Sequence, residues 1–321
     1  MLEAIAAGDL LVDFISLDVD VPLSAMPRFT GAAGGATANV AVGLQRQGIR
    51  AGFIGRVGDD PFGRHLRDTL AEAGVETSRV VFDAGARTTL AFIATRTDGR
   101  KDIAFYRHPG AEMLLRPEDI PADYLRGARL FHFGSITLSK SPAREAALHG
   151  ARLARELGLL VSYDPNWRPT LWDDHEEAGR VLWEAMPLAD IVHCAEEEWE
   201  FVTGTADLAA GAAKILAAGP KLVVVTCGAE GCWYGTASAQ GRVPGFAVET
   251  VDTVGAGDAF VAALLAQVLR SGKSTDALSD AELREIMVYA NAAGALTVTR
   301  PGVIPSLPTA AEVGAFLETR R

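Results

Sequence analysis

The sequence predicts an α/β fold in which a mostly parallel, doubly wound sheet carries a small additional β-sheet. A unit of amphipathic helix, glycine and apolar strand recurs along the chain, and such alternation is typical of doubly wound folds. The strands expected at 159–164 and 222–227 are almost continuously apolar, as parallel strands buried on both faces are. Two segments, 9–21 and 87–107, break this pattern and predict the small sheet.

The first of these segments follows directly on the start of the chain. Residues 1–18 contain acidic residues and no basic leader region, so we interpret them as a first strand rather than a signal peptide. From Asp9 to Val21 the residues alternate loosely between polar and apolar, as in a strand with one wet face.

The second segment reads as a hairpin. Its arms, 88–96 and 101–107, are joined by Asp98-Gly99, a dipeptide that favours tight hairpin turns. Together with 9–21 it would form a small sheet that is either a lid over a substrate or an extension of the sheet edge. Its exposed apolar face favours pairing with a second copy of the chain.

Glycines mark the expected helix ends throughout the rest of the chain. Gly48, Gly74, Gly158 and Gly219 stand where a helix C-terminus favours a left-handed residue. No long polar linker divides the sequence, so we expect residues 1–321 to form a single domain.

Composition narrows the class of protein. The 321 residues are 49% hydrophobic, which allows a large core, and no apolar run approaches 18 residues, so no transmembrane helix is expected. A net charge of −11 disfavours nucleic acid as the main partner, although a local arginine pocket could still bind an anion. The odd number of cysteines (Cys194, Cys227 and Cys232) indicates a reducing, cytoplasmic environment and structural roles.

A glycine turn enters an apolar, helix-like run at residues 252–263. Gly255 and Gly257 allow close approach of a ligand to the backbone, and free N–H groups at a helix start attract anions. Asp258 in the first turn has two interpretations. It stabilises the helix N-terminus, or it takes a proton from a hydroxyl while the N–H groups of residues 255–257 hold a transferring phosphoryl group.

Polar residues follow the apolar strands, where ligands bind in open α/β sheets. The expected strands end at Ser135, Asp164, Ala195 and Thr226, and Gly228 and Gly231 come after the last. These loops should meet residues 255–258 at one rim. No GxxxxGK[ST] loop is present, so ATP would have to be held by other loops.

Three further sets of residues are candidates for ligand binding. Gly34, Gly35 and Asn39 precede a helix expected near Ala38 and suit sugar hydroxyls, or form a plain glycine-rich turn. Arg107 and Arg168 could clamp an anion, or form surface ion pairs. Glu198, in the acidic run 196–198, could hold a water of hydrated magnesium, or belong to a solvated first helical turn.

Together these residues resemble the ribokinase-like (PfkB) family of sugar kinases. Two separated segments carry the resemblance, residues 34–63 and 252–263, and it extends from Gly8 to Pro308. The resemblance implies a three-layer α/β/α sandwich with a mostly parallel central sheet and a projecting β-sheet lid. It also implies ATP and Mg²⁺ as cosubstrate and cofactor, and in many members a monovalent cation, often potassium.

The resemblance assigns roles position by position. Asp258 matches the catalytic base, and Gly255, Ala256 and Gly257 match the anion hole. Asp13, Gly34, Gly35 and Asn39 match sugar-binding positions, with Arg107, Arg168 and Asp164 as further substrate contacts. Thr226, Gly228, Gly231 and Asn291 match nucleotide positions, and Asp252 and Ser306 match the monovalent-cation site. Ala195 departs from the family's usual asparagine three residues before Glu198.

Within the family, residues 105–115, 131–139 and 163–172 are most similar to fructokinases. The resemblance therefore implies phosphorylation of fructose to fructose 6-phosphate, with ribose, an aminoimidazole riboside or 2-keto-3-deoxygluconate as alternative substrates. A catalytically silent sugar- or nucleotide-binding regulator is a further alternative. The expected partners are a small sugar, ATP and a second copy of the chain, paired through the lid.

Overall fold

The computed structural model describes residues 1–97 and 101–320, and a nine-stranded sheet is the largest feature of this part of the chain. Its strand order is β13-β12-β11-β10-β9-β8-β1-β4-β5. Neighbours from β11 to β5 run parallel, whereas β12 and β13 form an antiparallel edge. The strands are β1 (Ala4–Ala7), β4 (Ala51–Gly58), β5 (Glu76–Asp83), β8 (Leu130–Gly134), β9 (Leu160–Asp164), β10 (Ile191–Ala195), β11 (Leu222–Thr226), β12 (Cys232–Gly235) and β13 (Gln240–Val243).

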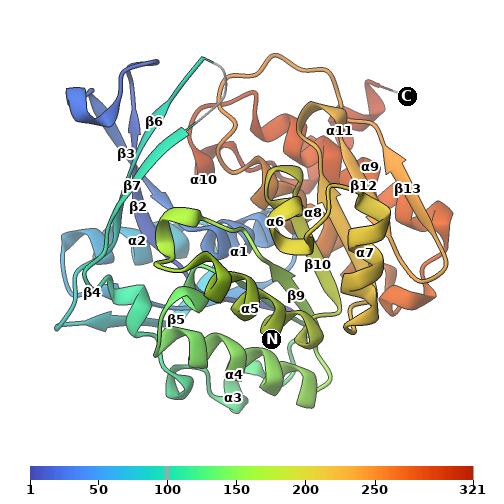
Figure 1. Ribbon diagram of the computed structural model, residues 1–321, viewed down its shortest axis with the longest axis horizontal. Coiled ribbons are helices and arrows are strands. Elements are labelled where there is room, and N and C mark those ends of the chain that lie inside the picture. Colours follow the sequence, from blue (N-terminus) through green and yellow to red (C-terminus); the bar gives the residue numbers. More distant parts are fainter. Residues whose placement is uncertain (98–100, 321) are drawn as a thin grey trace.

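Helices cover both faces of this sheet and make the predicted three-layer sandwich (Figure 1). One layer holds α3 (Ala122–Leu125), α4 (Ala143–Glu156), α5 (His175–Ala185), α6 (Glu196–Thr203) and α7 (Leu208–Ala217). The other holds α1 (Ala36–Arg46), α2 (Pro61–Glu72), α8 (Ala256–Ser271), α9 (Asp280–Thr297), α10 (Val303–Ser306) and α11 (Ala310–Glu318).

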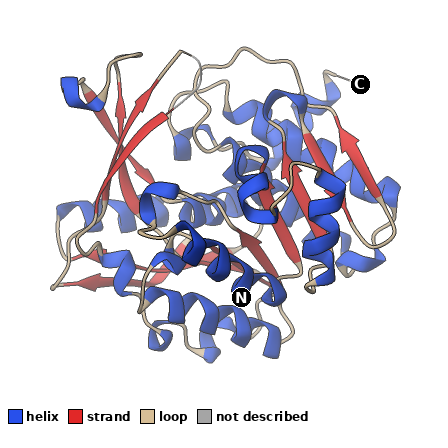
Figure 2. Cartoon of the chain, in the orientation of Figure 1, coloured by secondary structure: helices blue, strands red, loops and turns tan. Residues whose placement is uncertain are grey.

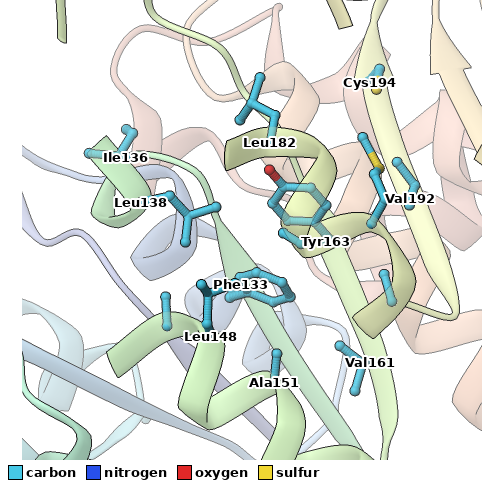
Figure 3. Close-up of a cluster of buried hydrophobic side chains, with 14 of the residues drawn as sticks. Phe133, Ile136, Leu138, Leu148, Ala151, Val161, Tyr163, Leu182, Val192 and Cys194 are labelled. Carbon is cyan, nitrogen blue, oxygen red and sulfur yellow. The ribbon is translucent and has the colours of Figure 1, made fainter. Parts of the chain in front are cut away.

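Alternate residues of the central strands pack into different layers, because successive side chains point to opposite faces. Phe131, Phe133 and Tyr163 belong to the buried cluster that contains residues of α4 and α5. The rings of Phe133 and Tyr163 (Figure 3) stack with centroids 4.7 Å apart. Burying each such ring contributes on the order of 2–3 kcal/mol. This packing anchors the strands whose other face carries polar side chains, described below.

A separate four-stranded sheet, order β3-β2-β6-β7, projects from one corner of the molecule (Figure 2). Its strands are β2 (Leu11–Ser16), β3 (Phe29–Gly34), β6 (Leu90–Thr95) and β7 (Lys101–Tyr106). β6 and β7 pair antiparallel, as the predicted hairpin requires. The Asp98-Gly99 turn lies outside the described residues.

Three predictions about strands and helix starts were wrong or incomplete. The N-terminal segment is not one strand, because the chain passes from β1 in the large sheet to β2 in the small one. β3 was not predicted, since four of its six residues are glycine or alanine and give it no alternation of polar and apolar side chains. Helix α1 begins at Ala36 rather than near Ala38.

The predicted helix-ending glycines are confirmed. Gly48, Gly74, Gly158 and Gly219 all have positive φ angles, between 76° and 135°. Residues 9–10 and 17–21 lie outside the observed β2, which is shorter than the alternation of polar and apolar residues suggested.

Two features bear on the chemical environment of the chain. No helix in the described residues is long and apolar enough to cross a bilayer. Cys194, Cys227 and Cys232 are all free thiols and all buried, and burial raises the pKa of each.

Candidate active site

A row of polar side chains lies on the α8-facing side of the central strands, near their carboxyl ends. Nδ1 of His132 is 3.1 Å from Oγ of Ser162 on the next strand. Nδ1 of His193 is 3.4 Å from Oδ2 of Asp164, and its Nε2 is 3.2 Å from Oγ1 of Thr226. The predicted rim therefore exists, because β8, β9, β10 and β11 are adjacent and parallel.

Asn39 and Asp258 meet at this rim from opposite parts of the sequence. Nδ2 of Asn39, on the first turn of α1, donates a 2.8 Å hydrogen bond to Oδ2 of Asp258, on the first turn of α8. The residues are 219 positions apart, so this contact joins the two segments that carried the family resemblance. Oδ1 of Asn39 is buried without a partner in the described part of the chain.

The environment of Asp258 favours its neutral form far more than water does. The pKa of Asp258 is raised to about 7, chiefly by burial and also by the charges of Asp164 and Asp9, although the hydrogen bond from Asn39 opposes these effects. A carboxyl with a pKa near neutrality can both accept and release a proton at the pH of a cell. The arrangement therefore suits a general base.

Asp258 does not serve as a cap for its helix. The N-cap of α8 is Gly255, with φ at 83° and no side-chain cap bond. A Cβ at Gly255 would lie 2.6 Å from Cγ1 of Val303, whereas a Cβ at Gly257 would meet nothing within 4 Å. The turn is thus tightly packed on one side and open at Gly257, which leaves room for an anion at the helix start.

Asp252 fixes this turn to a second loop. Its Oδ1 accepts from the N–H of Val254 at 3.0 Å, and its Oδ2 accepts from the N–H of Gly302 at 3.1 Å. Ser306, buried in α10, donates from Oγ to the carbonyl of Val303 at 2.7 Å. Lone pairs on the Asp252 carboxylate and the Ser306 hydroxyl remain available to a cation.

The small sheet brings Asp13 close to the start of α1. A Cβ at Gly34 would lie 2.0 Å from Oδ2 of Asp13, so only glycine at this position lets the buried carboxylate approach. Gly35 has φ at 112°, and a Cβ there would lie 2.4 Å from the carbonyl oxygen of Asp9. Both glycines are required by contacts of the folded chain rather than by a generic turn.

Arg107 is not a surface ion-pair residue, which was one interpretation of the sequence. It is buried, its Nη2 donates to Oγ of Ser139 at 2.8 Å, and its Nε lies 3.6 Å from Oε1 of Glu112. Burial lowers the pKa of Arg107 and raises that of Glu112. Nη1 of Arg107 and Oε1 of Glu112 have no hydrogen-bond partner within the described residues.

The acidic run divides into exposed and buried members. Glu196 and Glu197 are exposed, as a solvated helix start predicts, but Glu198 is buried. Its two oxygens accept the N–H groups of Ala195, at 2.9 Å, and of Trp167. Burial, together with the charge of Asp164, raises the pKa of Glu198 to about 7, although the two N–H bonds oppose this shift.

Arg168 lies beside this group of acids. It is half-buried, and its Nη1 donates to the carbonyl of Trp167 at 3.2 Å. Its charge lowers the pKa values of Asp164, Glu198 and Asp258, although burial is the larger influence on all three.

The predicted nucleotide positions surround the β11–β12 connection. Thr226 ends β11, Gly228 begins a short 3₁₀ turn and Gly231 follows that turn, with φ angles of 55° and 98° respectively. Asn291 on α9 reaches this region, where its Nδ2 donates to the carbonyls of Val243 and Pro244, both at 3.1 Å.

Two residues of the site were not predicted. Asp9 is buried and holds the start of α1, where its carboxylate accepts the N–H of Ala36 at 2.7 Å and the hydroxyl of Thr37 at 2.9 Å. His193 is also buried; burial opposes its charge, but Asp164, Glu198 and Asp258 together raise its pKa. The sequence does carry one signal for His193, because it is a polar residue within the otherwise apolar strand β10.

Comparison with known proteins gives consistent results. The model of the pfkB family carbohydrate kinases matches residues 1–310. Fructokinase-1 of Zea mays is 44% identical over 315 residues, which are 98% of this chain and 97% of the relative.

Solved structures share the whole architecture. Fructokinase from Xylella fastidiosa with bound ATP has a TM-score of 0.90 and 34% identity, covering 100% of this chain and 99% of that one. A double mutant of fructokinase from Vibrio cholerae O395, solved with fructose, ADP and a potassium ion, has a TM-score of 0.87 and 34% identity, covering 98% of each chain.

Proposed function

The chain belongs to the pfkB family of carbohydrate kinases, and from that premise we propose that it is an ATP-dependent fructokinase. The reaction moves the γ-phosphoryl group of ATP to a hydroxyl of fructose, giving fructose 6-phosphate and ADP. The similarity to fructokinases along the full length supports this substrate. The observation that carries the mechanism is the hydrogen bond between Asn39 and Asp258 at the carboxyl rim of the sheet.

Asp258 is the proposed general base. In its ionised form it accepts the proton of the attacking hydroxyl as the oxygen bonds to phosphorus and the bond from phosphorus to ADP breaks. Asn39 stabilises that ionised form through its 2.8 Å hydrogen bond. General-base catalysis of this kind contributes about 10²- to 10⁴-fold to the rate.

The N–H groups of Gly255, Ala256 and Gly257 form the proposed anion hole. They stand at the start of α8, a 16-residue helix, so the helix dipole adds to their attraction for negative charge. This matters most in the transition state, when charge is spread over the phosphoryl oxygens. The open space at Gly257 supports the placement.

The sugar is proposed to lie between the small sheet and the start of α1. Asp13, Gly34, Gly35 and Asn39 would contact its hydroxyls, and the unpartnered Oδ1 of Asn39 offers an acceptor for one of them. Asp164, Arg107 and Arg168 would complete the pocket. Two arginines can clamp an anionic group only if neither is already paired, but Arg107 has Glu112 beside it. This arrangement favours a neutral sugar over an acidic one.

ATP is proposed to lie over the β11–β12 connection, along Thr226, Gly228, Gly231 and Asn291. Mg²⁺ would neutralise the charge on the phosphates, and Glu198 would hold one of its waters. In the described residues no group of three acidic, histidine or cysteine side chains could hold a metal ion, which fits a Mg²⁺ held mainly by phosphates and water.

A monovalent cation is proposed beside the phosphate turn, held by Asp252 and Ser306. Asp252 already connects that turn to Gly302, so a bound cation would stiffen the same link. Potassium should therefore raise kcat, and sodium at equal ionic strength should do so less. Equal rates in both salts would remove this part of the proposal.

The small sheet is proposed to act as a lid and as the dimer interface of a single-domain, cytoplasmic protein. One of its faces carries stacked aromatic side chains, with Phe14 and Phe92 centroids 5.0 Å apart, and Tyr106 beside them is 68% exposed. Phe14 and Phe92 are partly exposed, and apolar side chains that gather at a surface are typical of interfaces. Light scattering over a range of concentrations measures the oligomeric state, and a monomer throughout would contradict the dimer.

The substrate is tested by measuring kcat/KM for a panel of sugars in an assay of ADP release. The panel contains fructose, ribose, an aminoimidazole riboside and 2-keto-3-deoxygluconate, and Asp258→Asn serves as the background control. Fructose is expected to give the highest kcat/KM. A clear preference for another sugar would replace the proposed substrate, and nucleotide binding without transfer to any sugar would indicate a regulator instead.

A further inference from the structure

The contact between α1 and α8 one turn below the Asn39–Asp258 pair is unusually close. Gly43 of α1 faces Ala262 of α8, and a Cβ at Gly43 would lie 2.5 Å from the Cβ of Ala262. Real Cβ atoms essentially never approach so closely. The two helices therefore lie at a spacing that only a glycine at one of the two positions permits.

This contact is in register with the site. Gly43 lies four residues after Asn39 and Ala262 lies four residues after Asp258, so each pair lies on the same face of its helix. The helices enter the contact from the same end, with the hydrogen-bonded pair in the first turn and the small pair in the next. Any change in helix separation at Gly43 is thus passed directly to the Asn39–Asp258 bond.

We infer that Gly43, packed against Ala262, is a positioning residue that sets the distance between the Asn39 amide and the carboxylate of Asp258. The inference rests on the proposed function only for its consequence in catalysis. The bond has little tolerance, because it is already at 2.8 Å and hydrogen bonds weaken beyond about 3.2 Å. A methyl group at position 43 forces α1 and α8 apart and lengthens it.

The consequence concerns the protonation of Asp258. The charged or titratable groups that act on it are Asp9 after β1, Asp164 on β9, Arg168 in the loop after β9 and His193 on β10. None of these lies on α1, so Asn39 is that helix's contribution to keeping the carboxylate ionised. Loss of the bond raises the pKa of Asp258 above its value of about 7.

The test compares the wild type with three variants. Gly43→Ala adds the clashing methyl, and Gly43→Ala/Ala262→Gly removes the opposing one and restores the spacing. Gly150→Ala is the matched control: it adds a Cβ 2.8 Å from Cζ of Phe131 in a helix remote from the site. Glycine inside a helix costs about 1 kcal/mol relative to alanine. Any stability that Ala262→Gly restores in the double variant must therefore come from relief of the clash.

The first readout is the dependence of kcat/KM on pH. Gly43→Ala is expected to move the acid limb upward by about one pH unit, the scale of a hydrogen bond to a charged group. With that shift, kcat/KM of Gly43→Ala falls by about tenfold at pH 6 and by less than about twofold at pH 9. The double variant should return to the wild-type profile, and Gly150→Ala should keep it.

The inference would be overturned if kcat/KM of Gly43→Ala fell by the same factor at every pH. It would also be overturned if the double variant folded but kept the shifted acid limb of kcat/KM. If the single variant fails to fold, rescue of folding by Ala262→Gly carries the test, because a double variant that also fails to fold would show that the Gly43–Ala262 contact does not limit the spacing.

The second readout does not depend on activity. The pKa of the Asp258 carboxyl can be followed by ¹³C NMR, with the resonance assigned by its absence in Asp258→Asn. The same upward shift is expected in Gly43→Ala, and its reversal in the double variant. A protein that phosphorylates no sugar would refute the proposed function, while these titrations would still decide the role of Gly43.

Discussion

Replacing Asp258 by asparagine should stabilise the folded chain, by an amount that grows with pH. Asparagine has nearly the same shape and keeps an oxygen that can accept the bond from Asn39, but it cannot ionise. In the wild type the pKa rises from 3.8 to about 7 on folding, chiefly through burial. Ionisation of this carboxyl therefore costs more free energy in the folded state than in the unfolded state, where water solvates the charge.

The magnitude and sign follow from this shift. The unfolded carboxyl loses its proton near pH 4 and the folded one near pH 7, so wild-type stability falls as the pH rises between these values. A shift of about three units corresponds to about 4 kcal/mol once both states are ionised, and to about 2 kcal/mol at pH 5. The asparagine variant carries no such penalty.

Calorimetry on both proteins from pH 5 to pH 8 measures the difference in Tm. For a chain of this length 1 kcal/mol moves Tm by about 1.5 °C. The variant should melt about 6 °C higher at pH 8 and about 3 °C higher at pH 5. A gap that does not change with pH, or a variant that melts below the wild type, would refute the argument that burial raises the pKa of Asp258.

Three other perturbations test separate parts of the account. Asp258 helps to raise the pKa of His193, and the two groups act on each other reciprocally, so His193→Gln should move the acid limb of kcat/KM to higher pH by about half a unit to one unit; an unmoved limb would contradict this coupling. Gly255→Ala places a methyl 2.6 Å from Val303 at a φ of 83°, so both Tm and kcat should fall, and unchanged kinetics would argue against this turn as the anion hole. Arg56→Met leaves two nearly buried carboxylates unpaired, so the free energy of unfolding should fall by about 3 kcal/mol while KM for the sugar stays constant; a change in KM alone would contradict a purely structural role.

The sequence predicts the helix and sheet layers well because their helices and strands have characteristic local sequence patterns. The glycines that end helices, such as Gly48 and Gly158, and the apolar strands each reveal themselves within about ten residues. The strand Phe29–Gly34 does not, because its pairing with β2 rather than its own composition makes it a strand. The break between β1 and β2 falls at Gly8-Asp9, but these two residues do not show that the chain passes there from one sheet to another.

The candidate site shows the same division. Asp258 and the Gly255–Gly257 turn could be named from spacing, and their partner Asn39 from the second glycine-rich segment. That the two side chains bond to each other depends on the packing of α1 against α8 through Gly43, which no local pattern indicates. His193 was overlooked for a similar reason, because its importance comes from Asp164 on the neighbouring strand.

The most direct test of the central claim is the turnover of Asp258→Asn with fructose and ATP, measured together with the Kd for fructose by calorimetry. The account predicts that kcat falls by about two to four orders of magnitude, while Kd stays within a few-fold of the wild type because the shape of the site is kept. Near-normal turnover in this variant would contradict the assignment of Asp258 as the base that activates the sugar.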